Sequence, residues 1–411
     1  MWRIFLLLVC LMGGTAFAQP MSCLVADVES GYIFSRQNMD VPLPPASLTK
    51  VMTLYLTFSA LDQGWLKMDS QLPVSEWAAS QEPSNLELRP GDTISVREAI
   101  LALIVKSAND VAVVLAEALA PSEQDFSNMM TQAAAQLGMA QTVFKNASGL
   151  YHPDQLSSAH DMAILTLATI KNFPHYYPLF SSQSFTFHGR EYKTHNHVLM
   201  DYQGAEGFKT GYISAVGYNI ISTATQNNRR LVGIVIGDQS VQERDSYVRA
   251  LLDSGFEKVR RQQQAVTQGK LQPAFDPLQR RVMVNQLNMA VFAPVMKRQA
   301  QHALSIGKKL VAHNGKAPIS SMTLATTQSP DYNWSIQIGA FNTQEKAFSM
   351  ANRALSFLKN QNYSVQTQRK NAQTYRSRLT GFRTKQMAQS ACNTLQNKNY
   401  ACFVVAPQGD K

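Results

Sequence analysis

The chain has 411 residues, 45% of them hydrophobic, and a formal net charge of +10. This length predicts two or three domains, with enough apolar residues for packed cores rather than a wholly disordered chain. The charge is uneven: residues 258–411 contain 22 Lys and Arg but 4 Asp and Glu, whereas residues 1–257 are net acidic. Two units with different partners are therefore expected, and the basic one suits an anionic polymer or surface.

The first 18 residues have the pattern of a secretory signal peptide. Arg3 precedes an apolar run, Ile4–Met12, and Ala16-Phe17-Ala18 forms a small-x-small cleavage site. A buried N-terminal strand or helix is the alternative. The apolar run is too short to cross a bilayer, and no later segment is long and apolar enough. We expect an exported, periplasmic protein without a transmembrane span after cleavage, which argues against nucleic acid as a partner.

Residues 19–259 are expected to form an α+β domain whose terminal strands share one sheet. A hairpin over 22–37 is followed by the stiff segment Pro42–Pro45 and by a helix from Ser47 to about Leu61. The later elements expected in chain order are helices over 96–120 and 155–173, strands over 183–188, 207–213, 217–224 and 230–237, and a helix over 241–258.

Residues 260–331 have a different composition. A glutamine run, Gln262–Gln264, two Arg pairs and scattered prolines leave few residues for a core. This composition predicts a basic, mostly disordered linker, with a short helix over 286–296 as the alternative.

Residues 332–411 are again regular and predict a βαββαβ module. Its elements are expected at 334–341, 343–360, 363–368, 373–380, 383–397 and 400–405. Cys392 and Cys402 lie ten residues apart within it, and an oxidising compartment permits a disulfide between them. Two buried free thiols are the alternative. Cys23 is then unpaired, and we expect it to be buried in the first strand.

Three short motifs in the first domain carry chemistry. They are Ser47-Leu48-Thr49-Lys50, Ser107-Ala108-Asn109 and Lys209-Thr210-Gly211. Each is common by chance, but their order and placement are more specific. The first opens a helix behind prolines, the second lies at a helix end or loop, and the third lies on a predicted strand.

A serine hydroxyl becomes a good nucleophile when a base takes its proton. Residues three apart share a helix face, so Lys50 is expected beside the Ser47 hydroxyl. Lysine is a base only when it is neutral, and burial together with a second cation lowers its pKa. Lys209 is the expected second cation. Backbone N–H groups at the helix start can donate to an oxyanion beside Ser47.

The remaining motif residues suit substrate binding. Ser107 can relay a proton, and Asn109 can hold a substrate amide. Lys209 and Thr210 suit a terminal carboxylate, and Gly211 allows the substrate backbone to approach the strand. We expect the second oxyanion donor to be the backbone N–H of Tyr212.

Residues 22–258 resemble the low-molecular-mass penicillin-binding proteins of the D-alanyl-D-alanine carboxypeptidase family, in which this trio of motifs occurs. The resemblance extends to segments around the trio: Pro45–Thr53, Ser148-Gly149-Leu150, Ser158–Ala163, Asn196–Leu199 and Gly207–Tyr212.

This resemblance implies a β-lactamase/transpeptidase-like fold, a five-stranded antiparallel sheet with helices on both sides. It also implies acylation of Ser47 by the penultimate D-Ala of a peptidoglycan stem peptide, followed by hydrolysis. β-Lactams would act as covalent inhibitors, and no metal or cofactor is implied. Many relatives carry a basic residue near His195 that helps to hold the substrate carboxylate. Histidine would be a weaker, pH-dependent substitute.

The C-terminal module resembles the SPOR family through Trp334–Phe341, Tyr375–Phe382 and the ending from Cys392 to Cys402. SPOR modules bind glycan strands stripped of stem peptides, which concentrate at division sites. The candidates for the sheet face that meets sugar are Gln337, Tyr375, Arg376 and Arg378.

Three other functions remain open. A D,D-endopeptidase differs only in the acceptor and the shape of the groove. A β-lactamase needs fast deacylation, for which no segment clearly supplies a dedicated glutamate. A non-catalytic peptidoglycan-binding protein would carry a degenerate trio.

Overall fold

The computed structural model describes residues 22–268, 282–314 and 334–405, the last range with short gaps at 356, 359–363, 372–373, 383–384 and 399. The chain divides into two compact units, 1–318 and 319–411, which we describe separately. The predicted signal peptide lies outside the described residues. Within these residues, no helix is long and apolar enough to cross a membrane.

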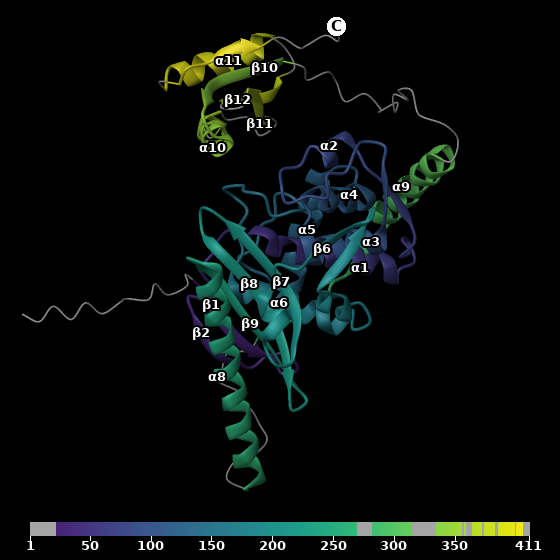
Figure 1. Ribbon diagram of the computed structural model, residues 1–411, viewed down its shortest axis with the longest axis vertical. Coiled ribbons are helices and arrows are strands. Elements are labelled where there is room, and N and C mark those ends of the chain that lie inside the picture. The colour runs from purple at the N-terminus through teal and green to yellow at the C-terminus, as the bar shows by residue number, and fades with distance from the viewer. Residues whose placement is uncertain are drawn as a thin grey trace, which may run out of the picture. The chain divides into compact units, whose positions relative to one another are not determined.

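The first unit is built on a five-stranded antiparallel sheet in the order β2-β1-β9-β8-β7 (Figure 1). Its strands are β1 (Ser22–Asp27), β2 (Ile33–Gln37), β7 (Ala205–Ile213), β8 (Gly217–Gln226) and β9 (Arg229–Asp238). The N-terminal hairpin pairs with the last strand, β9, so both ends of the domain share one sheet. This arrangement confirms the predicted α+β class.

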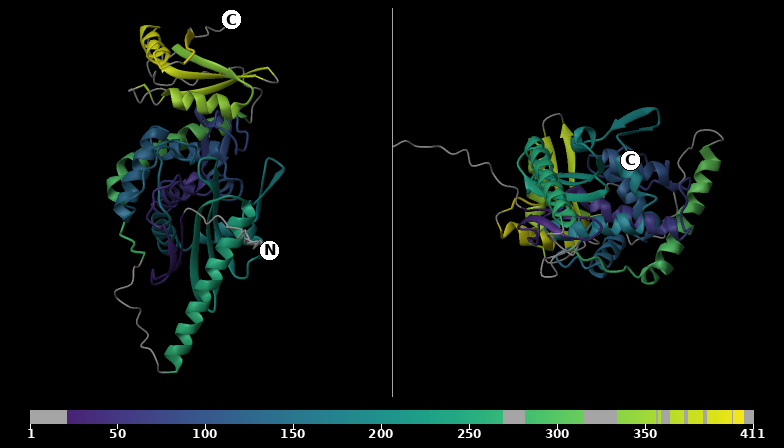
Figure 2. Two further views of the ribbon diagram at one scale, coloured as in Figure 1. Left: turned by 90° about the vertical axis from the view of Figure 1, so that its left-hand side faces the viewer. Right: turned by 90° about the horizontal axis from the view of Figure 1, so that it is seen from below.

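Helices cover both faces of this sheet. Successive side chains of a strand point to opposite faces, so neighbouring residues enter different cores. Leu24 packs into the larger core, with α1 (Lys50–Asp62), α4 (Asn109–Leu119), α5 (Glu123–Leu137) and α6 (Ala159–Asn172). Val25 packs into the smaller core, beneath α8 (Val241–Thr267). The last turns of α8 extend beyond the edge of the sheet in Figures 1 and 2.

The predicted single helix over 96–120 is interrupted in its middle. Helix α3 (Val96–Leu101) continues into the π-helical turn η2 (Ala102–Lys106), and the chain then reverses at Ser107 before α4 begins. Ser107 has a left-handed backbone, with φ +62°. Such conformations are uncommon in non-glycine residues and are found often at functional sites. The uniform Ala, Leu and Val composition of this stretch concealed the break.

Several short elements surround these layers. They are the 3-10 helices η1 (Ala46–Thr49) and η3 (Tyr177–Ser181), the helices α2 (Glu76–Ala79) and α7 (His197–Asp201), and the paired strands β3 (Gln71–Pro73) with β4 (Thr93–Ser95) and β5 (Ser184–Phe187) with β6 (Arg190–Lys193).

The expectation of a mostly disordered linker over 260–331 is wrong for residues 260–267, which continue α8, and for residues 282–314. After the 3-10 turn η4 (Met289–Val291), helix α9 (Ala293–Asn314) packs against α4 and β3. Helix α9 is the green helix labelled in Figure 1. The main core of the first unit includes Phe292, Met296, Ala300 and Ala303. These residues repeat at helical spacing, but the Lys, Arg and Gln between them make the segment polar on average. The rest of the predicted linker, 269–281 and 315–331, lies outside the described residues.

The second unit has a four-stranded sheet in the order β11-β12-β10-β13. Its elements are β10 (Trp334–Phe341), α10 (Gln344–Leu355), β11 (Ser364–Asn371), β12 (Thr374–Phe382), α11 (Lys385–Gln396) and β13 (Phe403–Val405). This is the predicted βαββαβ order. Cys392 and Cys402 form a disulfide that joins α11 to the segment before β13. Cys23 is a buried free thiol in β1, as expected.

Candidate active site

Ser47 and Lys50 lie one helical turn apart where η1 continues into α1. Lys50 Nζ is 3.0 Å from Ser47 Oγ. The preceding prolines are held in place by the sheet, because Asn219 Nδ2 of β8 donates to the carbonyl oxygen of Pro45 at 3.2 Å. Ala46 has a positive φ of +50°, which turns the chain immediately before the serine. The local sequence therefore brings the side chains of Ser47 and Lys50 together, and the contact with β8 fixes the position of the segment that precedes them.

The Lys50 amine is buried and has two further oxygen partners. It donates to Asn109 Oδ1 at 2.7 Å and to the carbonyl oxygen of Ser148 at 2.6 Å. Burial lowers its pKa well below the usual value, and the positive charge of Lys209 lowers it further, although Asp110 opposes the shift. A neutral amine has two N–H donors and one lone pair. The two carbonyl oxygens can take the donors and leave the lone pair for Ser47.

Asn109 holds the base in place through its side-chain amide. Its Oδ1 accepts from Lys50, while its Nδ2 donates to the carbonyl oxygen of Glu82 at 2.8 Å. Its backbone N–H donates to the carbonyl oxygen of Ser84 at 2.6 Å. Both ends of the amide already have protein partners, so this geometry favours positioning of Lys50 over the substrate contact that the motif suggested.

Lys209 brings the third motif to the same place from β7. Its Nζ donates to Ser107 Oγ at 3.0 Å and to the carbonyl oxygen of Thr210 at 2.7 Å. Burial, and then the charge of Arg244, lower the pKa of Lys209 to about 7. The side chain is 2% exposed. The two serines and two lysines of the three motifs therefore form one cluster, from residues far apart in the sequence.

The chain after Lys209 runs beside the nucleophile. A Cβ added to Gly211 would lie 3.1 Å from the backbone nitrogen of Ser47. The side chain of Thr210 is half-buried, and that of Tyr212 is 57% exposed with its ring 4.5 Å from the ring of Tyr218. Gly211 thus keeps the strand close to the backbone N–H of Ser47.

Gly149 supports the other side of the nucleophile. Its φ is +86°, and a Cβ there would lie 1.9 Å from the carbonyl oxygen of Ala46. The same loop supplies the Ser148 carbonyl that binds Lys50. In the sequence, this segment is notable only for its family resemblance, and its physical role follows from the tertiary contact.

Arg244 is a site residue that was not predicted from the sequence. It lies on α8, is 3% exposed and donates to Asp245 Oδ1 at 2.6 and 2.9 Å. Its charge lowers the pKa of Lys209, and it contributes to the lowered pKa of His195, for which burial and Lys209 are the larger causes. Arginine in a polar helical stretch gives no signal in a single sequence.

His195 lies two residues before α7, and Asn196 caps that helix by accepting from the backbone N–H of Leu199. His197 is the first residue of α7, and its Nδ1 lies 3.3 Å from Asp245 Oδ2. In the described part of the chain, no three His, Cys, Asp or Glu side chains are arranged to hold a metal ion.

The second unit has a groove of about 520 Å³ on its sheet. Its lining residues are Gln337, Ala340, Arg376, Arg378, Phe403, Val404 and Val405. Three of the four predicted glycan-binding residues lie together here. Tyr375 is not in the lining, because it shares the side of β12 with Ser377 and Leu379, which face the helices.

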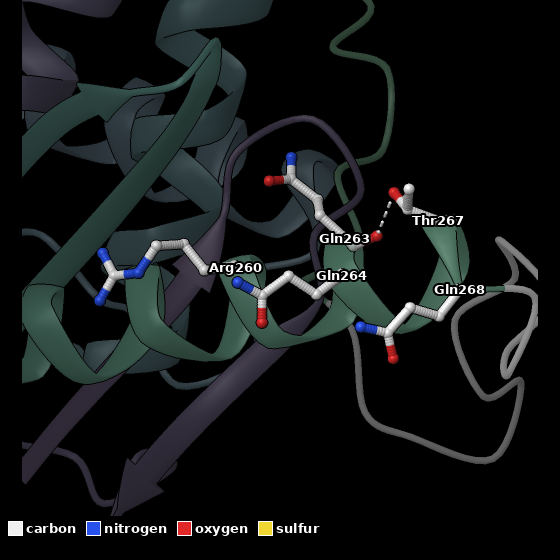
Figure 3. Close-up of a pocket in the computed structure, with 5 residues that line it drawn as sticks. All are labelled: Arg260, Gln263, Gln264, Thr267 and Gln268. Atoms are coloured by element: carbon white, nitrogen blue, oxygen red, sulfur yellow. Dashed lines mark hydrogen bonds between the residues drawn. The ribbon is translucent and has the colours of Figure 1, made fainter.

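A further hollow, of about 270 Å³, lies along the last turns of α8 (Figure 3). It is lined by Arg260, Gln263, Gln264, Thr267 and Gln268. These residues come from one helix and include none of the predicted site residues.

Two family models match the chain: D-alanyl-D-alanine carboxypeptidase over residues 17–240 and SPOR domain over residues 330–406. D-alanyl-D-alanine carboxypeptidase DacC of Escherichia coli K12 is 34% identical over 240 residues, 57% of this chain and 60% of that protein. The chain thus spans about three fifths of the length of such curated relatives.

Solved structures give the same likeness. Penicillin-binding protein 5 of Haemophilus influenzae matches with a TM-score of 0.57 and 33% identity, over 58% of this chain and 71% of that one. Penicillin-binding protein D2 of Listeria monocytogenes, in its cefotaxime-bound form, matches with a TM-score of 0.53 and 30% identity, over 58% and 97%.

Proposed function

Because the chain belongs to the D-alanyl-D-alanine carboxypeptidase family and carries a SPOR domain, we propose that it is a serine D,D-carboxypeptidase of the cell wall. Its substrate is the pentapeptide stem of peptidoglycan, from which it removes the terminal D-Ala through an acyl-enzyme on Ser47. The observation that carries this proposal is the buried Lys50 amine, with its lowered pKa, 3.0 Å from Ser47 Oγ.

Acylation begins when neutral Lys50 takes the hydroxyl proton of Ser47 and Oγ attacks the carbonyl carbon of the penultimate D-Ala. The backbone N–H groups of Ser47 and Tyr212 stabilise the oxyanion. The close packing of Gly211 against the Ser47 nitrogen supports this pairing of donors. Collapse of the intermediate breaks the peptide bond, and Ser107 relays the proton that the leaving amine of D-Ala needs.

The terminal carboxylate of the substrate binds at the cationic end of the cleft. Lys209 and Thr210 contact it, and Arg244 adds to the positive potential there. Burial and the neighbouring cations, Lys209 first, lower the pKa of His195, so near neutral pH this residue offers a hydrogen bond and no charge. A bound anion raises the pKa of Lys209, so this lysine takes up a proton when substrate binds near neutral pH. Water then hydrolyses the acyl-enzyme and regenerates Ser47. β-Lactams acylate the same serine and act as covalent inhibitors.

The SPOR domain binds denuded glycan strands and holds the enzyme at the cell wall, with enrichment at the division septum. Gln337, Arg376 and Arg378 contact the glycan, which is supported by their position in one groove. Phe403 joins them as an exposed aromatic residue. This function places the protein in the periplasm.

Digestion of pentapeptide-rich sacculi by the purified chain tests the catalytic proposal. Mass spectrometry of the products should show stems that have lost one D-Ala, and the Ser47→Ala variant should leave them intact. Release of monomers from cross-linked dimers would instead identify an endopeptidase. A chain that neither changes the sacculi nor becomes labelled by a fluorescent penicillin would be a binding protein.

A further inference from the structure

The groove of the SPOR domain contains a row of three side chains across three neighbouring strands. Gln337 on β10 pairs with Phe403 on β13 and with Arg378 on β12. Adjacent strands lie about 4.8 Å apart, so the two ends of this row are roughly 10 Å apart. The row can therefore contact two neighbouring units of a polymer at once.

One end of the row is cationic. Arg376 and Arg378 lie two residues apart on β12 and line the same groove. Within the described residues, the buried Nε of Arg378 has no hydrogen-bond partner. Partial burial, and then the charge of Arg376, lower the pKa of Arg378. Two adjacent cations with an unsatisfied buried donor are unfavourable unless an anion binds between them.

The other end of the row is aromatic. Phe403 lines the groove from β13 and is 53% exposed, so a ligand in the groove can reach its ring. An aromatic face can stack against the apolar C–H face of a sugar ring. From β13 to β12, the groove thus offers the Phe403 ring for stacking, the Gln337 amide in the middle and an anion site at Arg378.

We propose that the Arg376–Arg378 pair binds the lactyl carboxylate that a muramic acid residue exposes when its stem peptide is removed. This inference rests on the glycan binding proposed above and assigns its selectivity. In an intact strand, the lactyl carbonyl is part of a neutral amide and carries a bulky peptide. Hydrolysis of that amide leaves a carboxylate, which matches the planar donor array of a guanidinium.

The test uses the full chain as the Ser47→Ala variant, so that acylation does not contribute to retention. One ligand is glycan strands prepared from sacculi with an N-acetylmuramoyl-L-alanine amidase. The second is the same preparation after carbodiimide coupling to methylamine, which converts each carboxylate to a neutral amide. We expect the neutral strands to bind about tenfold to a hundredfold more weakly.

Arg378→Gln should lose a similar factor on the acidic strands and little on the neutral ones. Lys385→Gln, which removes one exposed charge on α11 outside the groove, is the matched control and should bind both like the parent. If Arg378→Gln weakened both ligands equally, the arginine would have a structural role only and the proposal would fail. Equal binding of the two ligands by the parent chain would overturn it without any substitution.

Free stem peptides, added as competitors, distinguish the source of the carboxylate. We expect no displacement of the chain from denuded strands. Displacement would assign the anion site to the peptide and overturn the proposal. A parent chain that binds neither strand preparation would contradict the glycan-binding function itself, whereas binding that ignores the carboxylate contradicts only this assignment.

Discussion

In the catalytic cleft, the Lys50 amine is buried and lies within hydrogen-bond distance of three protein oxygens. In the SPOR groove, Arg378 retains a buried donor without a partner in the described part of the chain. Chemistry on a serine requires an amine that has lost its proton, and burial together with the charge of Lys209 lowers the pKa of Lys50 accordingly. Recognition of a polymer requires a cation that keeps its charge, and arginine at a partly exposed groove does so. The environment of each cation, more than its sequence context, separates base from binding group.

The largest expected effect comes from removal of the nucleophile. Ser47→Ala should abolish labelling by a fluorescent penicillin while retention on denuded sacculi is unchanged, because the groove lies in the other unit. Ser59→Ala, on the buried side of the same helix, is the control and should label normally. Persistent labelling of Ser47→Ala would mean that another residue is the nucleophile.

The buried base provides the next effect. Lys50→Met should slow acylation by about 10²-fold to 10⁴-fold, in the range of a lost general base. Lys50→Arg should be similarly slow, because a guanidinium does not become neutral. Stopped-flow acylation measures this, with Lys67→Met, an exposed lysine, as the control. A fast Lys50→Arg enzyme would exclude proton abstraction by this residue.

The support of the nucleophile can be tested at two glycines with positive φ. Gly149→Ala should lower the free energy of unfolding by about 3 kcal/mol or more. The left-handed backbone alone costs about 1–3 kcal/mol for alanine, and the added Cβ also clashes with the carbonyl oxygen of Ala46. Gly189→Ala has the same backbone strain but open space around its Cβ, so it should cost less. Gly149→Ala should have the lower free energy of unfolding in denaturant and the slower acylation of the two variants. Equal losses would mean that the Gly149 contact is unimportant.

The lowered pKa of Lys209, about 7, predicts a pH dependence for substrate capture. Because its pKa is depressed, the free enzyme loses this cation as the pH rises through about 7, so kcat/KM for a carboxylate-bearing peptide should fall there. Lys209→Arg keeps its charge and should lose this alkaline limb, at a reduced overall rate. An unchanged limb in Lys209→Arg would assign it to another group.

The smallest effect on catalysis should follow removal of residues 334–411. Turnover of a soluble pentapeptide should remain within about twofold, since the cluster around Ser47 lies wholly in the first unit. Retention on amidase-treated sacculi should fall sharply. A chain cut before 282 should behave differently, because it also loses α9 and with it Phe292 and Met296 from the main core. Thermal unfolding would show that difference.

The sequence by itself determined the parts of this protein that depend on neighbours along the chain. Ser47 and Lys50 meet because residues three apart share a helix face. The order of strands and helices in the second unit and the strands of the main sheet followed from their periodicity, and Cys392 with Cys402 lay close enough to pair. Helix α5 was not predicted, and the break at Ser107 was not expected. Helix α9 was missed because its apolar residues are diluted by polar ones.

Tertiary structure alone decided the contacts that turn these parts into a site. The partners of Lys50 at Asn109 and Ser148 are 59 and 98 residues away, and Ser107 is 102 residues from Lys209. Local patterns carry no information on such distances. The burial that lowers the pKa of both lysines, the effect of Arg244 and the role of Gly149 all arise from packing between elements, which is settled only when the whole chain has folded.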